Sequence, residues 1–516
     1  MTSRTNSRTV NSIFNISAQA ATSMGSLVVS FLNRVVFLHY LNATYLGVSG
    51  LFSNILLILS LVELGLGAAL TQMFYKPFAD KDYDYLSKVT HTTRIVLNII
   101  GVLILILTFI FTPMLQFFVN DMNTVPHIRV IFLLYGVSSS VTYFLGYYRT
   151  IITANQQAYK LVKIDLLWKV VTFIAQALAL ALTRNFIIYL VVQIVLNYML
   201  NIVIRYFVRK EIPQIDYSCK EFIPQGARKT LLKNVAGLSL NRVATIVTNG
   251  TDNILISKYL DLITVGLASN YTMIQQSVNS LLEALFGPLL ASVGNLCVSG
   301  SEDEQYNLFN NLNFAAFWIY GFCSLTAFVL ADPFIEFVFG EEYLIREEAT
   351  FFLCLYIFVC GLYRVAYLFR TAQGLFWYGK FRPLIQSVIN LIVSLILVKV
   401  FGELWTIYAG TVISIIAITV WYEPHIVLKY GLGKTPWHFY RKMLFFSFIY
   451  FITLFLVRRI ILVLPLSGAA DLLVSACVCI VVINGIFAIF LFKTKEFQYW
   501  MSFLKSMIGR KKRIKR

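Results

Sequence analysis

The sequence predicts an all-α, polytopic membrane protein, and three observations support this fold class. Of the 516 residues, 58% are hydrophobic and only 13% are charged, whereas a soluble protein would carry roughly a quarter charged residues. The apolar residues come in blocks of about twenty, which is the length that crosses the hydrocarbon core of a bilayer. The connections between blocks are short, the longest running from Val208 to Asn234, so none of them can hold a soluble catalytic domain.

Hydropathy predicts about fourteen transmembrane spans. The first residues carry Arg4 and Arg8 but no short apolar core with a small-residue cleavage site, so we expect the first span to be a retained anchor. The spans define an N-terminal lobe (1–208), a cytoplasmic linker (209–233), a second lobe (234–428), two further spans (429–492) and a basic tail (493–516). The predicted spans lie near residues 13–38, 46–72, 89–112, 128–150, 162–182, 186–207, 235–258, 264–291, 310–331, 349–371, 383–401, 404–426, 443–463 and 470–492.

The distribution of Lys and Arg predicts the orientation. With the N-terminus inside, the outer connections hold few bases, namely Arg129, Arg184, Arg346, Arg458 and Arg459. This asymmetry places both termini in the cytoplasm. One inner connection departs from the rule, because Ser299–Tyr306 reads SGSEDEQY and has no base. The inner connections hold Lys76, Lys81, Lys88, Arg149, Lys160, Lys163, Arg209, Lys210, Lys220, Arg228, Lys229, Lys233, Lys380, Arg382, Lys429, Lys434, Arg441 and Lys442.

The tail is expected to be an amphipathic helix on the inner leaflet. Phe497, Trp500 and Met501 begin an apolar stripe at helical spacing, and the basic run RKKRIKR (510–516) follows. Such a helix binds membrane lipids through its apolar face and through anionic headgroups. The net charge of +18 lies largely in this tail and the inner loops, so nucleic acid is not a predicted partner.

Two segments about 220 residues apart resemble one another and predict a half-chain repeat. They are Tyr45–Leu70 and Val265–Leu290, each an apolar span with one acid inside it. A repeat with an intramembrane charge in each copy is typical of secondary transporters. The matched positions include Gly47 with Gly266, Glu63 with Glu283, and Gly67 with Gly287.

Polar residues lie on single faces of several predicted spans and indicate a water-filled cleft. Small polar residues also bond across packed membrane helices, so each one taken singly has a purely structural alternative. Charges in hydrocarbon are costly and usually face a cavity or a partner. The predicted polar lining consists of Asn15, Gln19, Asn33, Asn249, Gln276, Asn279, Tyr363 and Tyr367.

Arginines in or beside this cleft suit a phosphate-bearing substrate, because guanidinium binds phosphate in bidentate fashion and stays charged. Those near a membrane edge have an alternative role, in which the side chain reaches out to the headgroups. The candidates for phosphate binding are Arg34, Arg149, Arg242, Arg364 and Arg370.

Three acids inside predicted spans are candidates for ion pairing or ion coupling, namely Glu63, Asp252 and Glu283. They are expected either to pair with the cleft arginines or to bind a coupling H⁺ or Na⁺. No other cofactor is expected, because the sequence has no phosphate-binding loop of the Walker type and no metal-ligand spacing. The seven cysteines show no disulfide framework.

Two stretches carry a resemblance to a known family. SRTVNSIFN followed by FLNRVVFLHYLNATYLGVSGLFSNILLILSLVELGLGAAL, and later NRVATIVTNGTDNILISKYLDLITVGLASNYTMI, resemble polysaccharide transporters of the multidrug/oligosaccharidyl-lipid/polysaccharide (MOP) exporter superfamily. These are flippases of the Wzx type. The resemblance implies two pseudo-symmetric six-helix lobes around a central cationic cavity, followed by two extra C-terminal helices. It also implies a polyprenyl-pyrophosphate oligosaccharide as substrate, alternating access, and polysaccharide polymerase and other assembly proteins as partners.

Two other functional classes stay open from the residues alone. A drug or organic-cation antiporter of the same superfamily would show a more acidic cleft, whereas arginines outnumber acids here. A membrane polysaccharide polymerase, ligase or acyltransferase would need catalytic residues in a large outer loop. The outer connections Thr112–Arg129 and Ala331–Glu348 are short. The prediction is therefore a transporter and not an enzyme.

Overall fold

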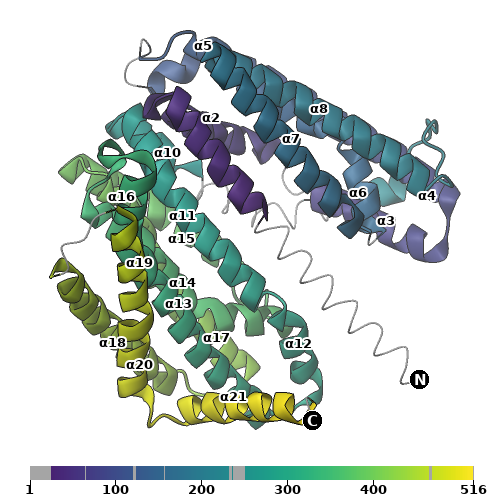
Figure 1. Cartoon of the computed structure of the whole chain (residues 1–516). Coiled ribbons are helices and arrows are strands. Elements are labelled where there is room, and N and C mark those ends of the chain that lie inside the picture. Colours follow the sequence, from purple (N-terminus) through teal and green to yellow (C-terminus); the bar gives the residue numbers. More distant parts are fainter. Residues whose placement is uncertain are drawn as a thin grey trace. The chain divides into compact units, whose positions relative to one another are not determined.

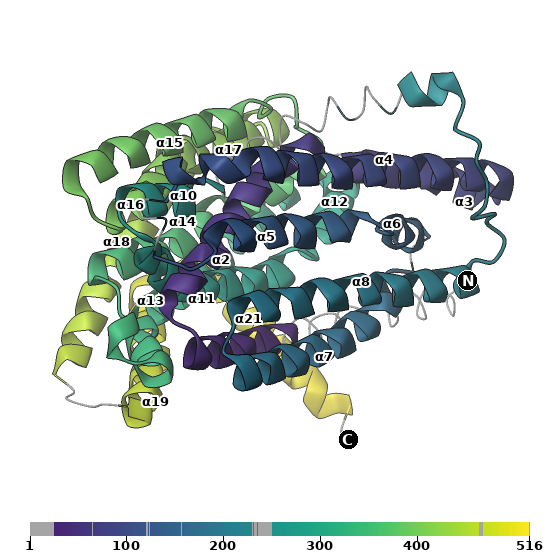
Figure 2. The same cartoon turned by 90° about the horizontal axis from the view of Figure 1, so that it is seen from above.

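The computed structural model describes residues 25–514 except 64–65, 120–121, 123, 156, 230, 232–234, 236–249 and 464–467. Within these residues the regular structure is entirely helical, with no strand. The chain divides into two compact units, Met1–Gly266 and Leu267–Arg516. Figures 1 and 2 show the helices of each unit running alongside one another.

Unit 1 is built from long helices with identifiable start signals. Asn42, Asp82 and Asn185 accept hydrogen bonds from backbone N–H groups in the first turns of α2, α4 and α8, as expected for N-cap residues. The elements are a helix at Gly25–Tyr40, α2 (Ala43–Leu59), a 3₁₀ turn (Ser60–Glu63), α3 (Leu66–Asp80), α4 (Tyr83–Phe111), a 3₁₀ turn (Thr112–Phe117), α5 (Ile128–Tyr143), α6 (Tyr147–Ala154), α7 (Tyr159–Thr183), α8 (Phe186–Glu211) and α10 (Asp252–Tyr259).

Unit 2 contains most of α11 (Leu262–Phe286) and the helices after it. Three π-helical segments interrupt them, at Ile415–Thr419, Val427–Gly431 and Cys479–Ile483, and such segments often occur at functional sites. The remaining helices are α12 (Leu289–Ser299), α13 (Glu302–Phe339), α14 (Glu347–Ala372), α15 (Arg382–Phe401), α16 (Trp405–Ser414), α17 (Val420–Ile426), α18 (Trp437–Leu462), α19 (Gly468–Val478), α20 (Asn484–Leu491) and α21 (Lys495–Ile514).

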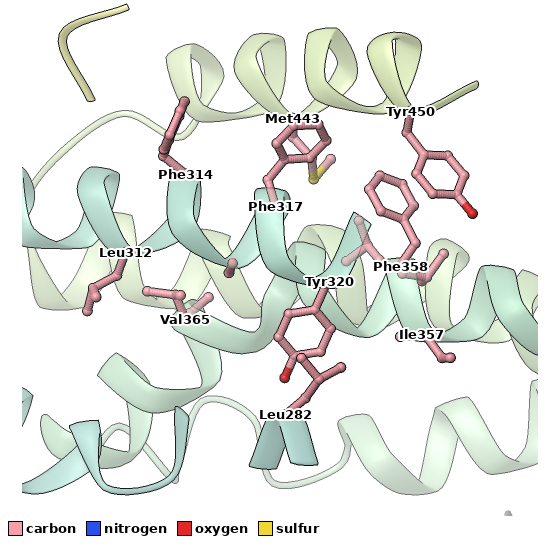
Figure 3. Packing of buried hydrophobic residues seen from close by; sticks show 14 of the residues in the cluster. Leu282, Leu312, Phe314, Phe317, Tyr320, Ile357, Phe358, Val365, Met443 and Tyr450 are labelled. Atoms are coloured by element: carbon pink, nitrogen blue, oxygen red, sulfur yellow. The ribbon is translucent and has the colours of Figure 1, made fainter. Parts of the chain in front are cut away.

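Aromatic packing forms the core of unit 2 (Figure 3). The rings of Phe358 and Tyr450 stack at 3.9 Å between centroids with an interplanar angle of 11°. The Tyr450 hydroxyl is hydrogen-bonded to Ser324 at 2.8 Å, so its polar end is satisfied inside the core. Phe317 points toward Met443 in the same cluster. These contacts join α13, α14 and α18.

The predicted polytopic, all-helical fold class is confirmed. Ten of the described helices are long and apolar enough to cross a membrane, and two shorter apolar helices lie at Gly25–Tyr40 and Ala43–Leu59. α11 falls outside those ten although it has 25 residues, because polar side chains interrupt its apolar surface. That composition fits the prediction that this segment lines a polar site.

α21 forms at the predicted place but is partly covered by protein. Phe497 stacks on Trp318 of α13 with 5.9 Å between centroids, and Trp500 Nε1 donates to the Asn311 carbonyl oxygen at 3.0 Å. Lys442 of α18 contacts Glu496 at 2.6 Å. Two residues of the stripe assigned to lipid therefore pack on α13, while Tyr499, Met501 and Phe503 remain exposed.

Candidate functional site

The repeated acids lie where the helices of both repeats are interrupted. In the first repeat, α2 gives way to the 3₁₀ turn that ends at Glu63. In the second, α11 ends at Phe286, just after Glu283, and α12 begins at Leu289 after Pro288. Glycine and proline at this point break the helical hydrogen bonding. Discontinuous membrane helices are a common framework for substrate and ion sites in transporters.

Glu283 forms an ion pair with Arg364 of α14. The guanidinium lies in the protein, with the Arg364 side chain 14% exposed, while that of Glu283 is 58% exposed. The arginine is therefore held by packing, whereas its carboxylate partner is largely exposed. Exposed ion pairs contribute about 0–1 kcal/mol, so a better anion can replace Glu283 at low cost.

Tyr367 lies between two of the predicted arginines. Its ring centroid is 5.9 Å from Arg364 Cζ and 5.4 Å from Arg370 Cζ. The exposed Tyr367 ring thus contributes a flat surface beside two cationic groups. Tyr363 lies one turn earlier on α14, half-buried, with its hydroxyl 3.6 Å from Cys360 Sγ. On α11, Gln276 is exposed and Asn279 is half-buried.

Arg370 belongs to a buried charged triad that sequence reasoning missed. Its Nε lies 2.9 Å from Glu423 Oε2, and Arg382 Nε lies 2.8 Å from Glu423 Oε1. The Glu423 side chain is 0% exposed, and the two arginines are almost as deeply buried. Arg382 also donates to Thr419 at 2.8 Å. One carboxylate therefore holds two guanidiniums together within α14, α15 and α17.

Glu423 could have been found from sequence, because it falls inside the predicted span 404–426. Arg382 is predicted to lie in an inner connection, and the structure instead buries its side chain against Glu423. In the structure, Glu423 lies on a seven-residue α-helix with a π-helical segment before it and another after it. Asp332 of α13 is a second acid that was missed, and it accepts hydrogen bonds from Tyr271 at 2.7 Å and Thr350 at 3.1 Å.

Glu63 in unit 1 has a hydroxyl partner where Glu283 has a guanidinium. Tyr143, the last residue of α5, donates to Glu63 Oε2 at 3.0 Å. Gly67 lies so close that a Cβ there would sit 2.9 Å from Glu63 Oε1. At the offset of 220 that matches Glu63 with Glu283, Tyr143 corresponds to Tyr363, the residue before Arg364. The partners of the two acids therefore come from neighbouring positions of the repeat and not from the same one.

Arg34 and Asn33 lie in the helix Gly25–Tyr40 among aromatic hydroxyls. Asn33 Nδ2 donates to the Tyr189 hydroxyl at 3.1 Å. Tyr135 and Tyr189 are near enough to interact electrostatically with the half-buried Arg34 guanidinium. The Tyr135 hydroxyl donates to Ser49 at 2.6 Å. This part of unit 1 is a polar, cationic region inside apolar helices.

Arg149 is fully engaged by Asp165 of α7. Its two terminal nitrogens lie 3.0 Å and 2.6 Å from the two carboxylate oxygens, which is the bidentate geometry that a phosphate would otherwise use. Asp252 opens α10, and its Oδ1 is buried without a hydrogen bond to the described residues. Arg242, Asn15, Gln19 and Asn249 lie outside the described residues.

The arrangement provides anion-binding groups and exchangeable carboxylates. Among the residues that the structure describes, no cluster of three or more His, Cys, Asp or Glu side chains could hold a metal ion. The ion pair of Arg364 with the more exposed Glu283 is suited to binding and releasing a charged solute, with Glu283 as the competing anion.

The family model described as "Polysaccharide biosynthesis protein" matches residues 41–348, more than half of the chain. No curated protein sequence matches the chain.

Solved structures of membrane transporters resemble this one. The lipid II flippase MurJ in an inward closed conformation has a TM-score of 0.64 at 16% identity, covering 92% of this chain and 98% of that one. An inward-facing multidrug resistance MATE family transporter of the MOP superfamily has a TM-score of 0.61 at 14% identity, covering 79% and 96%. A variant of the Vibrio cholerae MATE transporter VcmN has a TM-score of 0.57 at 12% identity, covering 82% and 98%. These likenesses confirm the predicted transporter fold.

Proposed function

Because this chain belongs to the polysaccharide biosynthesis protein family, we propose that it is a flippase for polyprenyl-pyrophosphate-linked oligosaccharides. It moves repeat units from the inner to the outer leaflet of a bacterial plasma membrane by alternating access, for capsule, O-antigen or exopolysaccharide synthesis. MurJ, whose fold it shares, is named as a lipid II flippase. The physical requirement is a cationic, wet site for the head group and open access to lipid for the tail.

The observation that carries this proposal is the ion pair of Arg364 with Glu283, in which the acid is exposed and the arginine is not. A pyrophosphate has more charge than a carboxylate and matches the guanidinium in bidentate fashion. It displaces Glu283, which moves into water without leaving a buried charge behind. Tyr367 beside Arg364 offers a flat face for the first sugar ring.

Flipping in sealed vesicles tests this function. We expect Arg364→Ala to slow the flipping of a fluorescent polyprenyl-pyrophosphate oligosaccharide at least about tenfold, because a charge-assisted contact to phosphate is lost. Arg458→Ala is the matched control, since Arg458 pairs with Glu347 on an exposed surface. Wild-type activity in Arg364→Ala, or an equal loss in Arg458→Ala, would contradict the assignment.

The MATE-like fold motivates one competing function, gradient-driven export of an organic cation. In the same vesicles, efflux of a cationic dye without flipping of any lipid-linked sugar would establish that alternative. The excess of arginine over acid around Tyr367 favours an anionic substrate instead.

We expect Glu283→Gln to tighten substrate binding, which is the opposite of the effect expected for Arg364→Ala. Removing the competing carboxylate frees Arg364, so the Kd for polyprenyl pyrophosphate should fall about fivefold, the effect of roughly 1 kcal/mol. Turnover should slow, because the acid no longer returns to displace the substrate. Binding by microscale thermophoresis and flipping in vesicles measure the two effects separately. Weaker binding in Glu283→Gln would show that Glu283 does not compete with the phosphate.

Coupling to a H⁺ or Na⁺ gradient is assigned to Glu63. Its hydrogen bond comes from the Tyr143 hydroxyl, so the carboxylate can change its charge or bind a cation without breaking an ion pair seen in the described residues. We expect Glu63→Gln to retain downhill flipping but to lose stimulation by an imposed ion gradient. Unchanged stimulation in Glu63→Gln would move the coupling site elsewhere.

A further inference from the structure

A polar pocket in unit 2 lies apart from the arginines. It has a volume of about 530 Å³, within the range of small-ligand sites. One wall comes from α12, a second from α13, and Tyr499 of α21 forms the third. Figure 1 shows α21 lying across the end of unit 2 at which α12 lies. The lining residues are Ser292, Asn295, Leu296, Ser299, Glu304, Asn307, Leu308, Asn311 and Tyr499.

The pocket is fixed by contacts made outside it. The α12–α13 turn is closed by a capping box, in which Ser301 and Glu304 bond to each other's backbone N–H groups. Gln305 donates to the Gly300 carbonyl oxygen at 3.0 Å. Tyr499 is positioned because its neighbour Trp500 bonds to the Asn311 carbonyl oxygen. The walls are therefore built before any ligand arrives.

Its polar groups are available for a ligand. The side-chain amides of Asn295, Asn307 and Asn311 have no hydrogen-bond partner in the described part of the protein. Each amide offers two donors and an acceptor, and Tyr499 adds a hydroxyl and a ring. Glu304 uses one oxygen in the capping box and retains the other. Alternating donors and acceptors beside an aromatic face are what the hydroxyl groups of a sugar require.

The pocket differs from the phosphate site in its charge. None of the nine lining residues is Lys or Arg, and the segment at its edge is the one predicted inner connection without a base. Glu302, Asp303 and Glu304 lie there in succession. A phosphate or an anionic lipid headgroup is repelled from this edge, whereas an uncharged sugar is not.

The pocket is connected to the proposed substrate site through the same helices. Glu283 on α11 precedes Asn295 on α12 by twelve residues, which corresponds to a rise of roughly 18 Å at helical spacing. At the other end, Gln373, which follows α14, bonds to Gln305 at 3.5 Å. An oligosaccharide has the length to extend from Arg364 toward this end of the unit.

We infer that this pocket is a binding subsite for neutral sugar residues of the lipid-linked oligosaccharide, an assignment that rests on the proposed function. Arg364 binds the pyrophosphate, and the α12–α13–α21 pocket binds sugars distal to it. The pocket would select substrates by the presence of a glycan before the carrier moves.

Binding of two lipids, one without and one with a glycan, distinguishes the sugar subsite from the phosphate site. Binding of undecaprenyl pyrophosphate, and of the same lipid bearing a neutral hexose tetrasaccharide, is measured on purified protein in nanodiscs. We expect Asn295→Ala/Asn307→Ala/Asn311→Ala to raise the Kd for the sugar-bearing lipid about tenfold, through the loss of several hydrogen bonds. The Kd for undecaprenyl pyrophosphate should stay unchanged. All three side chains lie at the surface of the pocket, so the thermal midpoint should also be unchanged.

Gln498→Ala is the matched control, because it removes an exposed amide from α21 next to Tyr499 but outside the pocket. Equal Kd values for wild type and triple variant with both lipids would overturn the subsite, and so would an equal loss with both lipids. Wild-type protein that binds neither lipid would overturn the proposed function itself.

Discussion

Replacing Glu423 with alanine is expected to lower the free energy of unfolding by about 3–5 kcal/mol, the usual cost of breaking a buried ion pair from one side. Glu423 has no exposed side-chain surface and lies between Arg370 and Arg382. Its removal leaves two buried guanidiniums facing one another with no counter-charge. The repulsion acts on α14, α15 and α17 together, so the loss should appear as lower stability of unit 2 and not as a local change.

Unfolding by denaturant in mixed micelles, followed by circular dichroism, measures this effect. Glu403→Gln is the control, because Glu403 pairs with Arg346 on an exposed surface and its loss should cost no more than about 1 kcal/mol. The double variant Glu423→Gln/Arg370→Gln should recover part of the stability, since it leaves only one buried charge. A Glu423→Ala protein as stable as Glu403→Gln would show that the triad does not stabilise the fold.

Composition and hydropathy were sufficient to predict the helical architecture. Long apolar runs have few alternatives in a bilayer, because every backbone group must be bonded within the segment. The residues at which the helices begin and end were less predictable. The span expected at 310–331 belongs to α13, which runs from Glu302 to Phe339, because acidic N-terminal residues extend a helix beyond its apolar part. The covering of the apolar stripe on α21 was not predictable either, because an apolar stripe does not specify whether lipid or protein covers it. In the structure, Phe497 and Trp500 of this stripe contact α13.

The site was predictable as a set of residues but not as a set of pairs. Intramembrane charges identified Glu283 and Arg364, yet only the packing of α11 against α14 shows that they meet. Arg149 looked equally suited to phosphate, but Asp165 lies opposite it and fills its bidentate geometry. Glu423 lies inside a predicted span, but its partners Arg370 and Arg382 are distant in sequence. Partners distant in sequence are fixed by tertiary structure, which a single sequence does not display.

Substituting valine for Gly266 is expected to abolish flipping and to lower stability by at least about 1–3 kcal/mol, the range for overpacking. A Cβ on Gly266 would lie 2.0 Å from the Ala43 carbonyl oxygen, and one on Gly47 would lie 1.8 Å from that of Leu262. Gly47 and Gly266 are one of the glycine pairs that the repeat matches, and their contacts are reciprocal. The obstacle is backbone, so no rotamer change relieves it, and α2 and α11 must separate.

Gly294→Ala and Gly485→Ala are the controls, because no atom lies within 4 Å of the Cβ that each would gain. Both should be neutral or slightly stabilising, since alanine is favoured over glycine in helices. Gly47→Val should reproduce the defect of Gly266→Val, because each glycine admits the other helix at the same crossing. Normal flipping and stability in Gly266→Val would show that this crossing tolerates separation. Loss of flipping with normal stability would instead show that the close approach of α2 and α11 at Gly47 and Gly266 is needed for the transport movement more than for folding.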